Sequence, residues 1–150
     1  MEWKIRKAIK EDENRIKELF IEMLQTIYHN KNVDGYEDGH LDKFFDNHDD
    51  WICVVEAEGS VIAYLSIEVY HEPEEYIYLD DLSVSEKYRN SGIGTQLIKT
   101  AEKFAEEIDI HQIVFHVEKS NTSAFRLYER LGYSIMRDDN TRFCMIKKYS

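Results

Sequence analysis

The passage from an apolar segment, 76–84, into a helical pattern near Thr95 constrains this chain most. The loop between them contains Arg89-x-x-Gly92-x-Gly94. Backbone N–H groups in such a strand–loop–helix turn converge while the helix dipole adds positive potential, so the turn is typical of an anion site. Glycine leaves room for a phosphate, and Arg89 can add charge. By themselves, the two glycines would also fit a tight turn without a ligand. The sequence is neither a P-loop nor a complete dinucleotide fingerprint.

Hydrophobic periodicity on both sides of this turn predicts alternating strands and helices. Apolar residues recur at helical spacing from Ile16 to Ile27, with Asp12 as a candidate N-cap, and residues 58–60 form a tight-turn signal. Strands are expected at 3–7, 51–56, 61–70, 76–84, 112–117, 134–136 and 142–148, and helices at 16–27, 41–45, 93–108 and 121–131. This order predicts a three-layer α/β architecture.

Length and charge exclude several classes of protein. The chain has 150 residues, which fits a single domain spanning 1–150. Its longest apolar runs have five residues, so a membrane-spanning helix is excluded and no membrane partner is expected. No apolar h-region follows Met1, which favours a cytoplasmic location. Acids outnumber Lys plus Arg by 30 to 19, which argues against nucleic acid as a partner.

Cysteine and histidine patterns predict neither a metal site nor a thiol nucleophile. Cys53 and Cys144 lie far apart without a CxxC motif, so we expect buried free thiols in a reducing compartment. The six histidines show no HxxxH or HExxH spacing, so no metal is expected. His116, on a predicted strand, is expected to be structural rather than a base.

Two separated motifs resemble one known family. The run LDDLSVSEKYRNSGIGTQLI, which starts at Leu79, resembles the central motif of the GNAT superfamily of acyl-CoA N-acyltransferases. Residues 121–133, NTSAFRLYERLGY, are similar to that superfamily's second motif, N-x-x-A-x-x-L-Y-x-x-x-G-F/Y. With the surrounding strands, the resemblance covers nearly the whole chain. The first helix and residues 34–50 are its least specific parts.

The resemblance implies a fold and a cofactor. The fold is a mixed, mostly antiparallel sheet that is flanked by helices and splays between the fourth and fifth strands, 76–84 and 112–117. The cofactor is acetyl-CoA, whose pantetheine arm would pair with the fourth strand while its pyrophosphate binds the loop amides. Contacts are then expected at Leu82, Val84, Arg89, Asn90, Ser91, Gly92, Ile93, Gly94, Thr95 and Asn121.

The resemblance also suggests which residues move protons. Attack of an amine on a thioester needs a base, and the departing thiolate benefits from an acid. Tyr128 matches the tyrosine that serves as general acid in many relatives, although it would also fit as an aromatic core residue. Asp80 and Asp81 resemble the acidic pair of diamine and spermidine/spermine acetyltransferases, which implies Asp80 as base through a water and Asp81 as an acceptor contact. Neighbouring strand residues face opposite sides unless a bulge intervenes, and both acids would also fit as partners of lysines or solvent.

Charge distribution suggests the acceptor. Residues 34–50 hold seven acids against Lys43 alone, and residues 72–81 add five acids without a base. If both segments flank the acceptor side of the cleft, they would concentrate a cationic small molecule such as a polyamine or aminoglycoside. Tyr36 and Tyr70 are candidates to line that side. The alternatives are a solvated acidic surface, an acetyltransferase for protein N-termini or lysines, and a non-catalytic acyl-CoA-binding module. The family makes a homodimer plausible.

Overall fold

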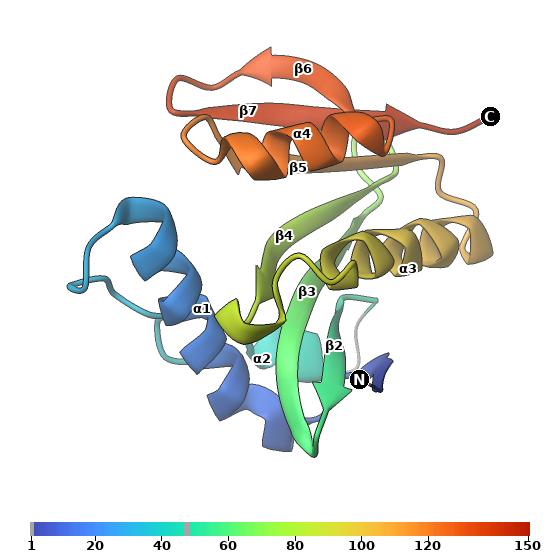
Figure 1. The fold of residues 1–150 in the computed structure, drawn as a ribbon. Helices are drawn as coiled ribbons and strands as arrows, with labels where there is room; N and C mark the ends of the chain where they lie inside the picture. Colours follow the sequence, from blue (N-terminus) through green and yellow to red (C-terminus); the bar gives the residue numbers. More distant parts are fainter. Residues whose placement is uncertain (1, 47–48) are drawn as a thin grey trace.

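The computed structural model describes residues 2–46 and 49–150, which form a seven-stranded sheet with helices packed against it (Figure 1). The strands are β1 (Trp3–Lys7), β2 (Trp51–Ala57), β3 (Ser60–Tyr70), β4 (Tyr76–Val84), β5 (Gln112–Glu118), β6 (Ser134–Asp138) and β7 (Arg142–Lys148). The helices are α1 (Glu13–Tyr28), α2 (Asp42–Phe45), α3 (Ile93–Glu107) and α4 (Thr122–Arg130). Strand order is β1-β2-β3-β4-β5-β7-β6, antiparallel throughout except for the parallel pair β4–β5.

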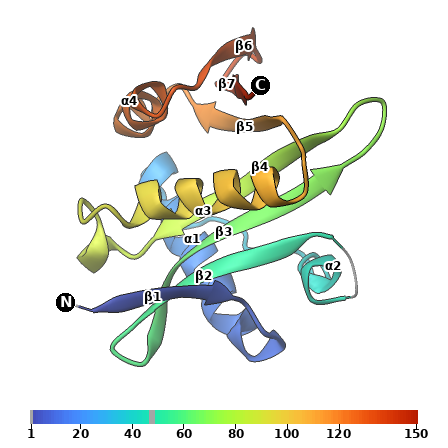
Figure 2. The same ribbon diagram turned by 90° about the vertical axis from the view of Figure 1, so that its right-hand side faces the viewer.

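Two hydrophobic cores lie on opposite faces of the sheet and create three layers. Leu65 packs into the core beneath α3 and α4, whereas Tyr64 packs into the core beneath α1 and α2. Neighbouring residues of one strand point to opposite faces, so these two cores define the faces of the sheet. Figure 1 shows α3 and α4 in front of the strands and α2 behind them, and Figure 2 shows α3 in front of the strands and α1 behind them. Among the residues that the structure describes, no helix is long and apolar enough to cross a membrane.

The predicted elements are confirmed with small changes at their ends. The strand 76–84 has the predicted bounds, whereas β6 continues two residues farther, to Asp138. The predicted cap of α1 is wrong in its contacts. The Asp12 carboxylate accepts hydrogen bonds from the Arg6 guanidinium at 2.8 and 3.0 Å and from the Ile9 N–H at 2.8 Å, instead of from the helix. A charged, bidentate partner therefore takes the side chain that would otherwise cap the helix.

The sheet splays at its only parallel pair among the described strands, as the predicted fold class requires. Strands β4 and β5 pair only where residues 77–79 face residues 113–115. Beyond that point, residues 80–84 keep β3 on one side and lose β5 on the other. Figure 1 shows the two strands diverging there. The splay leaves an unpaired strand edge in the middle of the sheet, where an extended ligand can add as a further strand.

Candidate active site

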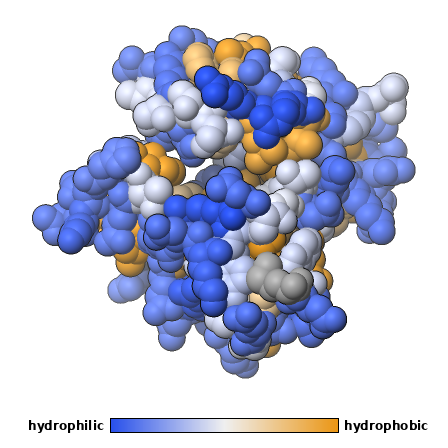
Figure 3. Space-filling model, in the orientation of Figure 1, coloured by the Kyte–Doolittle hydropathy of each residue, from blue (hydrophilic) through white to orange (hydrophobic). Residues whose placement is uncertain are grey.

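A cleft of about 960 Å³ opens at the splay. Its walls come from α1, the diverging parts of β4 and β5, the loop before α3, and α4. Figure 3 shows the surface hollowed between α1 and the layer that contains β5 to β7, with apolar side chains at the rim. Across this hollow, the Tyr28 hydroxyl of α1 donates a hydrogen bond to Glu118 of β5 at 3.0 Å.

The loop before α3 lines one half of the cleft with backbone. Gly92 is the N-cap of α3 and has a φ of 84°, a left-handed value that favours glycine. A Cβ at Gly94 would meet Leu82 and Leu127 only at 3.9 and 4.0 Å, so packing does not demand glycine there. Its missing side chain instead leaves the helix N-terminus open toward β4. All six residues from 90 to 95 belong to this loop or first turn, where the resemblance implies pyrophosphate.

The neighbouring predicted cofactor contacts already have partners of their own. The Arg89 Nε donates to the Val84 carbonyl at 2.9 Å, and its guanidinium lies 3.7 Å from Glu22 of α1. Asn121 is the N-cap of α4, where its side-chain oxygen accepts from the Ala124 N–H at 3.4 Å. Arg89 and Asn121 both line the cleft, as does Leu82 on the unpaired edge of β4. Of the predicted cofactor residues, all but Ser91 line the cleft, and the Ser91 hydroxyl instead donates to the Tyr88 carbonyl.

Tyr128 lies on the α3 and α4 face of the splay. Its ring packs edge-on against Phe115 with the centroids 4.4 Å apart, and the residue is 8% exposed while lining the cleft. Burial raises the pKa of the Tyr128 hydroxyl to about 12, which keeps the phenol protonated at neutral pH. Tyr128 therefore both packs in the core and lines the cleft. From the sequence alone, a core residue and a general acid were alternative interpretations of this tyrosine.

A β-bulge brings Asp80 and Asp81 to one face of the sheet. Leu65 pairs with Leu82, and Ile67 pairs with Leu79, so one residue of β3 faces both acids. Both acids therefore lie on the same face of the sheet as Tyr64, which is the face covered by α1 and α2. From the sequence, two neighbouring strand residues are expected on opposite faces unless a bulge intervenes. The bulge is present here, so the two acids share one face.

The two acids differ in their partners. Asp81 accepts a hydrogen bond of 2.5 Å from the Tyr36 hydroxyl, which lies 3.0 Å from the Tyr64 hydroxyl. Among the described residues, no hydrogen bond to the Asp80 carboxylate is found. Burial, the Asp81 charge and the Glu68 charge raise the pKa of Asp80 to about 7. Burial also raises the pKa of Asp81, although the Tyr36 hydrogen bond opposes the change.

Sequence reasoning missed a second polar chain on the cleft wall. The Tyr78 hydroxyl lies 2.6 Å from His116 Nδ1, and His116 Nε2 lies 2.9 Å from an Asp139 oxygen. Arg137 holds the same carboxylate at 2.6 and 2.9 Å. Tyr78 and His116 line the cleft, and burial lowers the pKa of the imidazole, which favours its neutral form at pH 7. The sequence could have indicated that Tyr78 and His116 lie close together, because they are on the two predicted strands that splay. It gave no such indication for Asp139, which lies in the distant β6–β7 turn.

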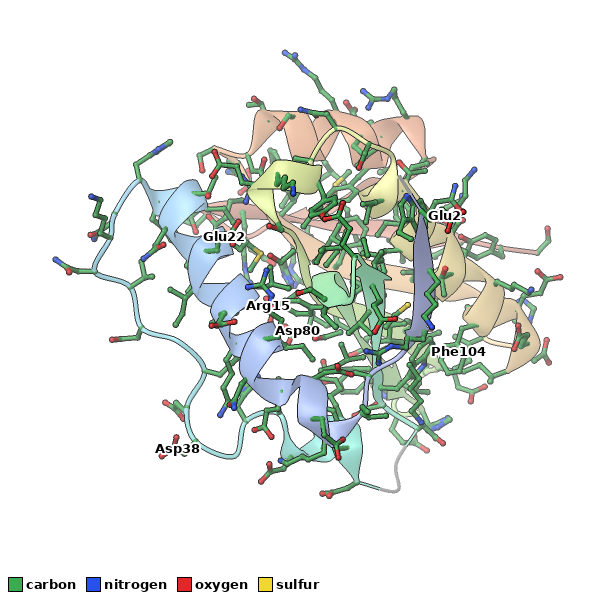
Figure 4. All side chains as sticks on the ribbon, turned by 60° about the horizontal axis from the view of Figure 1, so that its bottom comes forward. Glu2, Arg15, Glu22, Asp38, Asp80 and Phe104 are labelled. Carbon is green, nitrogen blue, oxygen red and sulfur yellow. The ribbon has the colours of Figure 1, made fainter. Side chains whose placement is uncertain are left out.

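Of the acids that the structure describes in the two acidic segments, only Asp80 and Asp81 line the cleft, so the segments do not flank it as expected. The acids that line it are Asp80, Asp81 and Glu118, and four arginines line it as well: Arg89, Arg126, Arg130 and Arg142. The acids of 34–50 find partners elsewhere, as Asp42 does with Lys10 and Asp49 with His71. Glu74 and Glu75 line a separate hollow with His111 at the opposite end of β4. Figure 4 shows Asp38 on an outer loop, away from Asp80.

The residues of segment 34–50 that reach the sheet face of Asp80 and Asp81 include Tyr36 and Lys43, neither of which is acidic. Lys43 of α2 forms an ion pair with Glu68, a buried residue of β3 that directly faces Tyr78 across the strand pair. Tyr70 also donates to Glu68, at 3.1 Å, so this predicted lining residue lies beside the acid cluster. Charge on the acceptor face therefore comes from three carboxylates in the sheet (Glu68, Asp80 and Asp81), and one lysine compensates them.

Cleft, bulge and glycine loop together define an α/β transferase fold with an open strand edge. The Acetyltransferase (GNAT) family matches residues 15–133, and the chain belongs to this family. An uncharacterized N-acetyltransferase of Methanocaldococcus jannaschii is 29% identical over 152 residues, which cover 96% of this chain and 90% of that protein. N-alpha-acetyltransferase 30 of Homo sapiens is 45% identical over 56 residues, or 37% of this chain and 16% of that much longer protein.

Solved structures agree on the fold. The PaiA N-acetyltransferase of Thermoplasma acidophilum, solved in complex with coenzyme A, superimposes with a TM-score of 0.82 at 21% identity. The match covers 99% of this chain and 100% of that one. The predicted GNAT architecture is therefore confirmed.

Proposed function

We propose that this chain transfers the acetyl group of acetyl-CoA to a primary amine by direct attack. The observation that carries the proposal is the division of the cleft between the two faces of the sheet. Tyr128 lies in the core under α3 and α4, whereas Asp80 lies on the α1 and α2 face at the bulge. A thioester held in the slit between β4 and β5 would present its sulfur to Tyr128 and its carbonyl to an amine from the side of Asp80.

The residues at the cofactor end fit acetyl-CoA. The amides from Asn90 to Thr95 would bind the pyrophosphate, since the N-terminus of α3 favours an anion. Arg126 and Arg130 of α4 supply further positive charge at the cleft. The free edge at Leu82 and Val84 would pair with the pantetheine, provided that Arg89 releases the Val84 carbonyl.

Asp80 would take the proton from the amine, directly or through a water. A carboxylate with a pKa near 7 is suited to this task, because it is a stronger base than an ordinary Asp while half of it remains ionised at neutral pH. The amine then attacks the carbonyl carbon, the C–S bond breaks, and Tyr128 gives its proton to the thiolate. Asp81, fixed by Tyr36, would orient the ammonium before it loses its proton.

The acceptor that we favour is a cationic small molecule such as a polyamine or aminoglycoside. Glu68 already binds an alkylammonium, that of Lys43, next to the two acids of the bulge. The support thus comes from the buried carboxylates rather than from the acidic segments around them. A protein N-terminus is the second candidate, because part of the chain resembles N-alpha-acetyltransferase 30.

Release of CoA from acetyl-CoA in the presence of different amines tests the proposal. Spermidine, an aminoglycoside, neutral amino acids and short peptides with free N-termini should be compared at several salt concentrations. We expect the polyamine to have the highest kcat/KM and to lose much of its lead as salt shortens the Debye length to about 8 Å. Preference for a peptide at all salt concentrations would select the second candidate. Cofactor binding without amine-dependent CoA release would indicate a non-catalytic binding module.

A further inference from the structure

His116, Asp139 and Cys144 form a side-chain cluster next to the cleft. His116 on β5 is the direct cross-strand partner of Cys144 on β7, so their side chains share one face of the sheet. Asp139 reaches the same place from the β6–β7 turn. One imidazole nitrogen, the thiol sulfur and one carboxylate oxygen all lie within 4.8 Å of one another. The acetyl transfer proposed above has no use for this thiol.

We propose that these three side chains bind a borderline-soft divalent cation, with Zn²⁺ as the reference ion. Zn²⁺ takes imidazole nitrogen, thiolate sulfur and carboxylate oxygen at about 2.0–2.3 Å, which places tetrahedral ligand atoms roughly 3.3–3.8 Å apart. The longest separation, at most 4.8 Å, would have to shorten by about 1 Å, whereas the 2.9 Å between His116 Nε2 and the Asp139 oxygen would have to open by about 0.4 Å. Mg²⁺ and Ca²⁺ are poor candidates, because they prefer sets made of oxygen atoms alone.

Neighbouring groups already orient the ligands. Tyr78 lies 2.6 Å from His116 Nδ1, which leaves Nε2 turned toward Asp139 at 2.9 Å. Arg137 fixes the Asp139 carboxylate through two hydrogen bonds of 2.6 and 2.9 Å. Outer contacts of this kind set the orientation of the imidazole and carboxylate ligands in metal sites. Cys144 is 1% exposed, so its position is fixed by the sheet around it.

The surrounding charges indicate reversible binding rather than a permanent structural metal. Burial raises the pKa of the Cys144 thiol, although the charges of Arg137 and Arg142 oppose the rise, and the same two charges repel a cation. Three protein ligands also leave the fourth tetrahedral position for water or another small ligand, as in open zinc sites. Since His116 lines the cleft, a bound dication would repel an incoming ammonium and block the acceptor half. This last consequence rests on the proposed function, whereas metal binding itself does not.

Cobalt binding gives a readout that is independent of catalysis. Co²⁺ added to the full chain after chelator treatment should produce sulfur-to-cobalt charge-transfer absorption that saturates at one ion per chain. Cys53→Ser is the matched control, because Cys53 is also a buried free thiol but is not part of the cluster. We expect the absorption to persist in Cys53→Ser and to disappear in Cys144→Ser. Equal absorption in both variants, or no saturable absorption in the wild type, would overturn the proposal.

A second variant, which changes another proposed metal ligand, keeps the test decisive if Cys144→Ser does not fold. Asp139→Asn changes a turn residue, so the fold should survive, and circular dichroism can verify this. We expect this variant to bind Zn²⁺ at least about tenfold more weakly in calorimetry. Unchanged affinity would remove Asp139 from the site and contradict the three-ligand cluster.

Inhibition provides the link to catalysis. Zn²⁺ should inhibit amine-dependent CoA release in Cys53→Ser and leave Cys144→Ser much less affected. Equal inhibition of both variants would refute the link between this site and the cleft. If no amine supports CoA release at all, the proposed function fails while the cobalt absorption still decides the metal site.

Discussion

The two halves of the cleft are built by different means. The half that we assign to the cofactor consists mainly of backbone from one continuous stretch, residues 82–95, where a strand edge, a glycine loop and a helix N-terminus follow one another. The acceptor half consists of side chains from separate elements. Asp80 of β4 and His116 of β5 line it. Behind them, Tyr36 from the segment before α2 contacts Asp81, Asp139 from the β6–β7 turn contacts His116, and Glu68 of β3 faces Tyr78.

Under the proposed function, this difference would separate binding of the donor from choice of the acceptor. Backbone amides recognise a phosphate whatever the surrounding side chains are, so a short glycine pattern suffices to specify that half. Recognition of an amine by the other half depends on individual charges and hydrogen bonds. Substitutions in one half should therefore leave ligand binding by the other half nearly unchanged.

The largest effect is expected for Asp80→Asn. The amide keeps the shape of the side chain but cannot accept the proton, so kcat should fall by about 10²–10⁴-fold. The affinity for acetyl-CoA, measured by calorimetry, should stay within about twofold. Wild-type turnover in this variant would remove Asp80 from the mechanism. His116→Gln is the matched comparison, because His116 also lines the cleft but has no role in the proposed transfer.

Wild type and Asp80→Asn should also differ in how kcat/KM and the free energy of unfolding depend on pH, and the direction of each change can be predicted. Asp80 works as a base only when it is ionised, so wild-type kcat/KM should rise as the pH increases through about 7. A folded-state pKa above the unfolded value of about 3.9 means that the native state binds this proton more tightly. The free energy of unfolding should therefore fall as the pH rises from about 4 through 7, and Asp80→Asn should flatten that fall. Denaturant titrations at several pH values can check the difference.

Tyr128→Phe should have the next largest effect. Removal of the hydroxyl keeps the edge-on contact with Phe115, so stability should change little. If the chemical step limits turnover, kcat should drop by about 10²-fold, because the thiolate leaves without an acid. A leaving-group series with acyl donors of lower thiol pKa provides the control, since better leaving groups should rescue the variant. Unchanged turnover across several amines would assign Tyr128 to the core alone.

The contrast between the halves also explains what the sequence could predict. Strand 76–84 and the loop with Gly92 and Gly94 were predictable, because periodicity and turn glycines act locally. The chain from Tyr78 through His116 to Asp139 was not, because its contacts span 38 and 23 residues and depend on the splay.

Two further expectations failed for a related reason. A count of the acids in residues 34–50 could not show that they do not line the cleft. Asp12 was predicted to cap a helix, but its carboxylate accepts hydrogen bonds from Arg6 instead.

A pair of glycine variants sharpens the description of the cofactor half. Gly94→Ala meets only ordinary contacts, so the fold should tolerate it, but the methyl group would lie where the cofactor approaches the helix. We expect acetyl-CoA to bind about tenfold more weakly, which corresponds to about 1.4 kcal/mol. Gly92→Ala should instead lower stability by about 1–2 kcal/mol through its left-handed φ. Equal effects of both variants on stability would contradict the distinct roles of the two glycines.

The smallest effect is expected for Tyr36→Phe, which tests how the acceptor half is held together. The hydroxyl joins the segment before α2 to Asp81 through a 2.5 Å hydrogen bond, while the ring stacks on Phe20 at 3.8 Å. Phenylalanine keeps the stack and removes the donor, so the free energy of unfolding should fall by about 1–2 kcal/mol. Without that donor the pKa of Asp81 should rise further, because Tyr36 lowers it in the wild type. KM for the amine should increase severalfold while acetyl-CoA affinity stays constant. An equal loss of acetyl-CoA affinity would show that the two halves are coupled through β4, and the separation argued above would then be wrong.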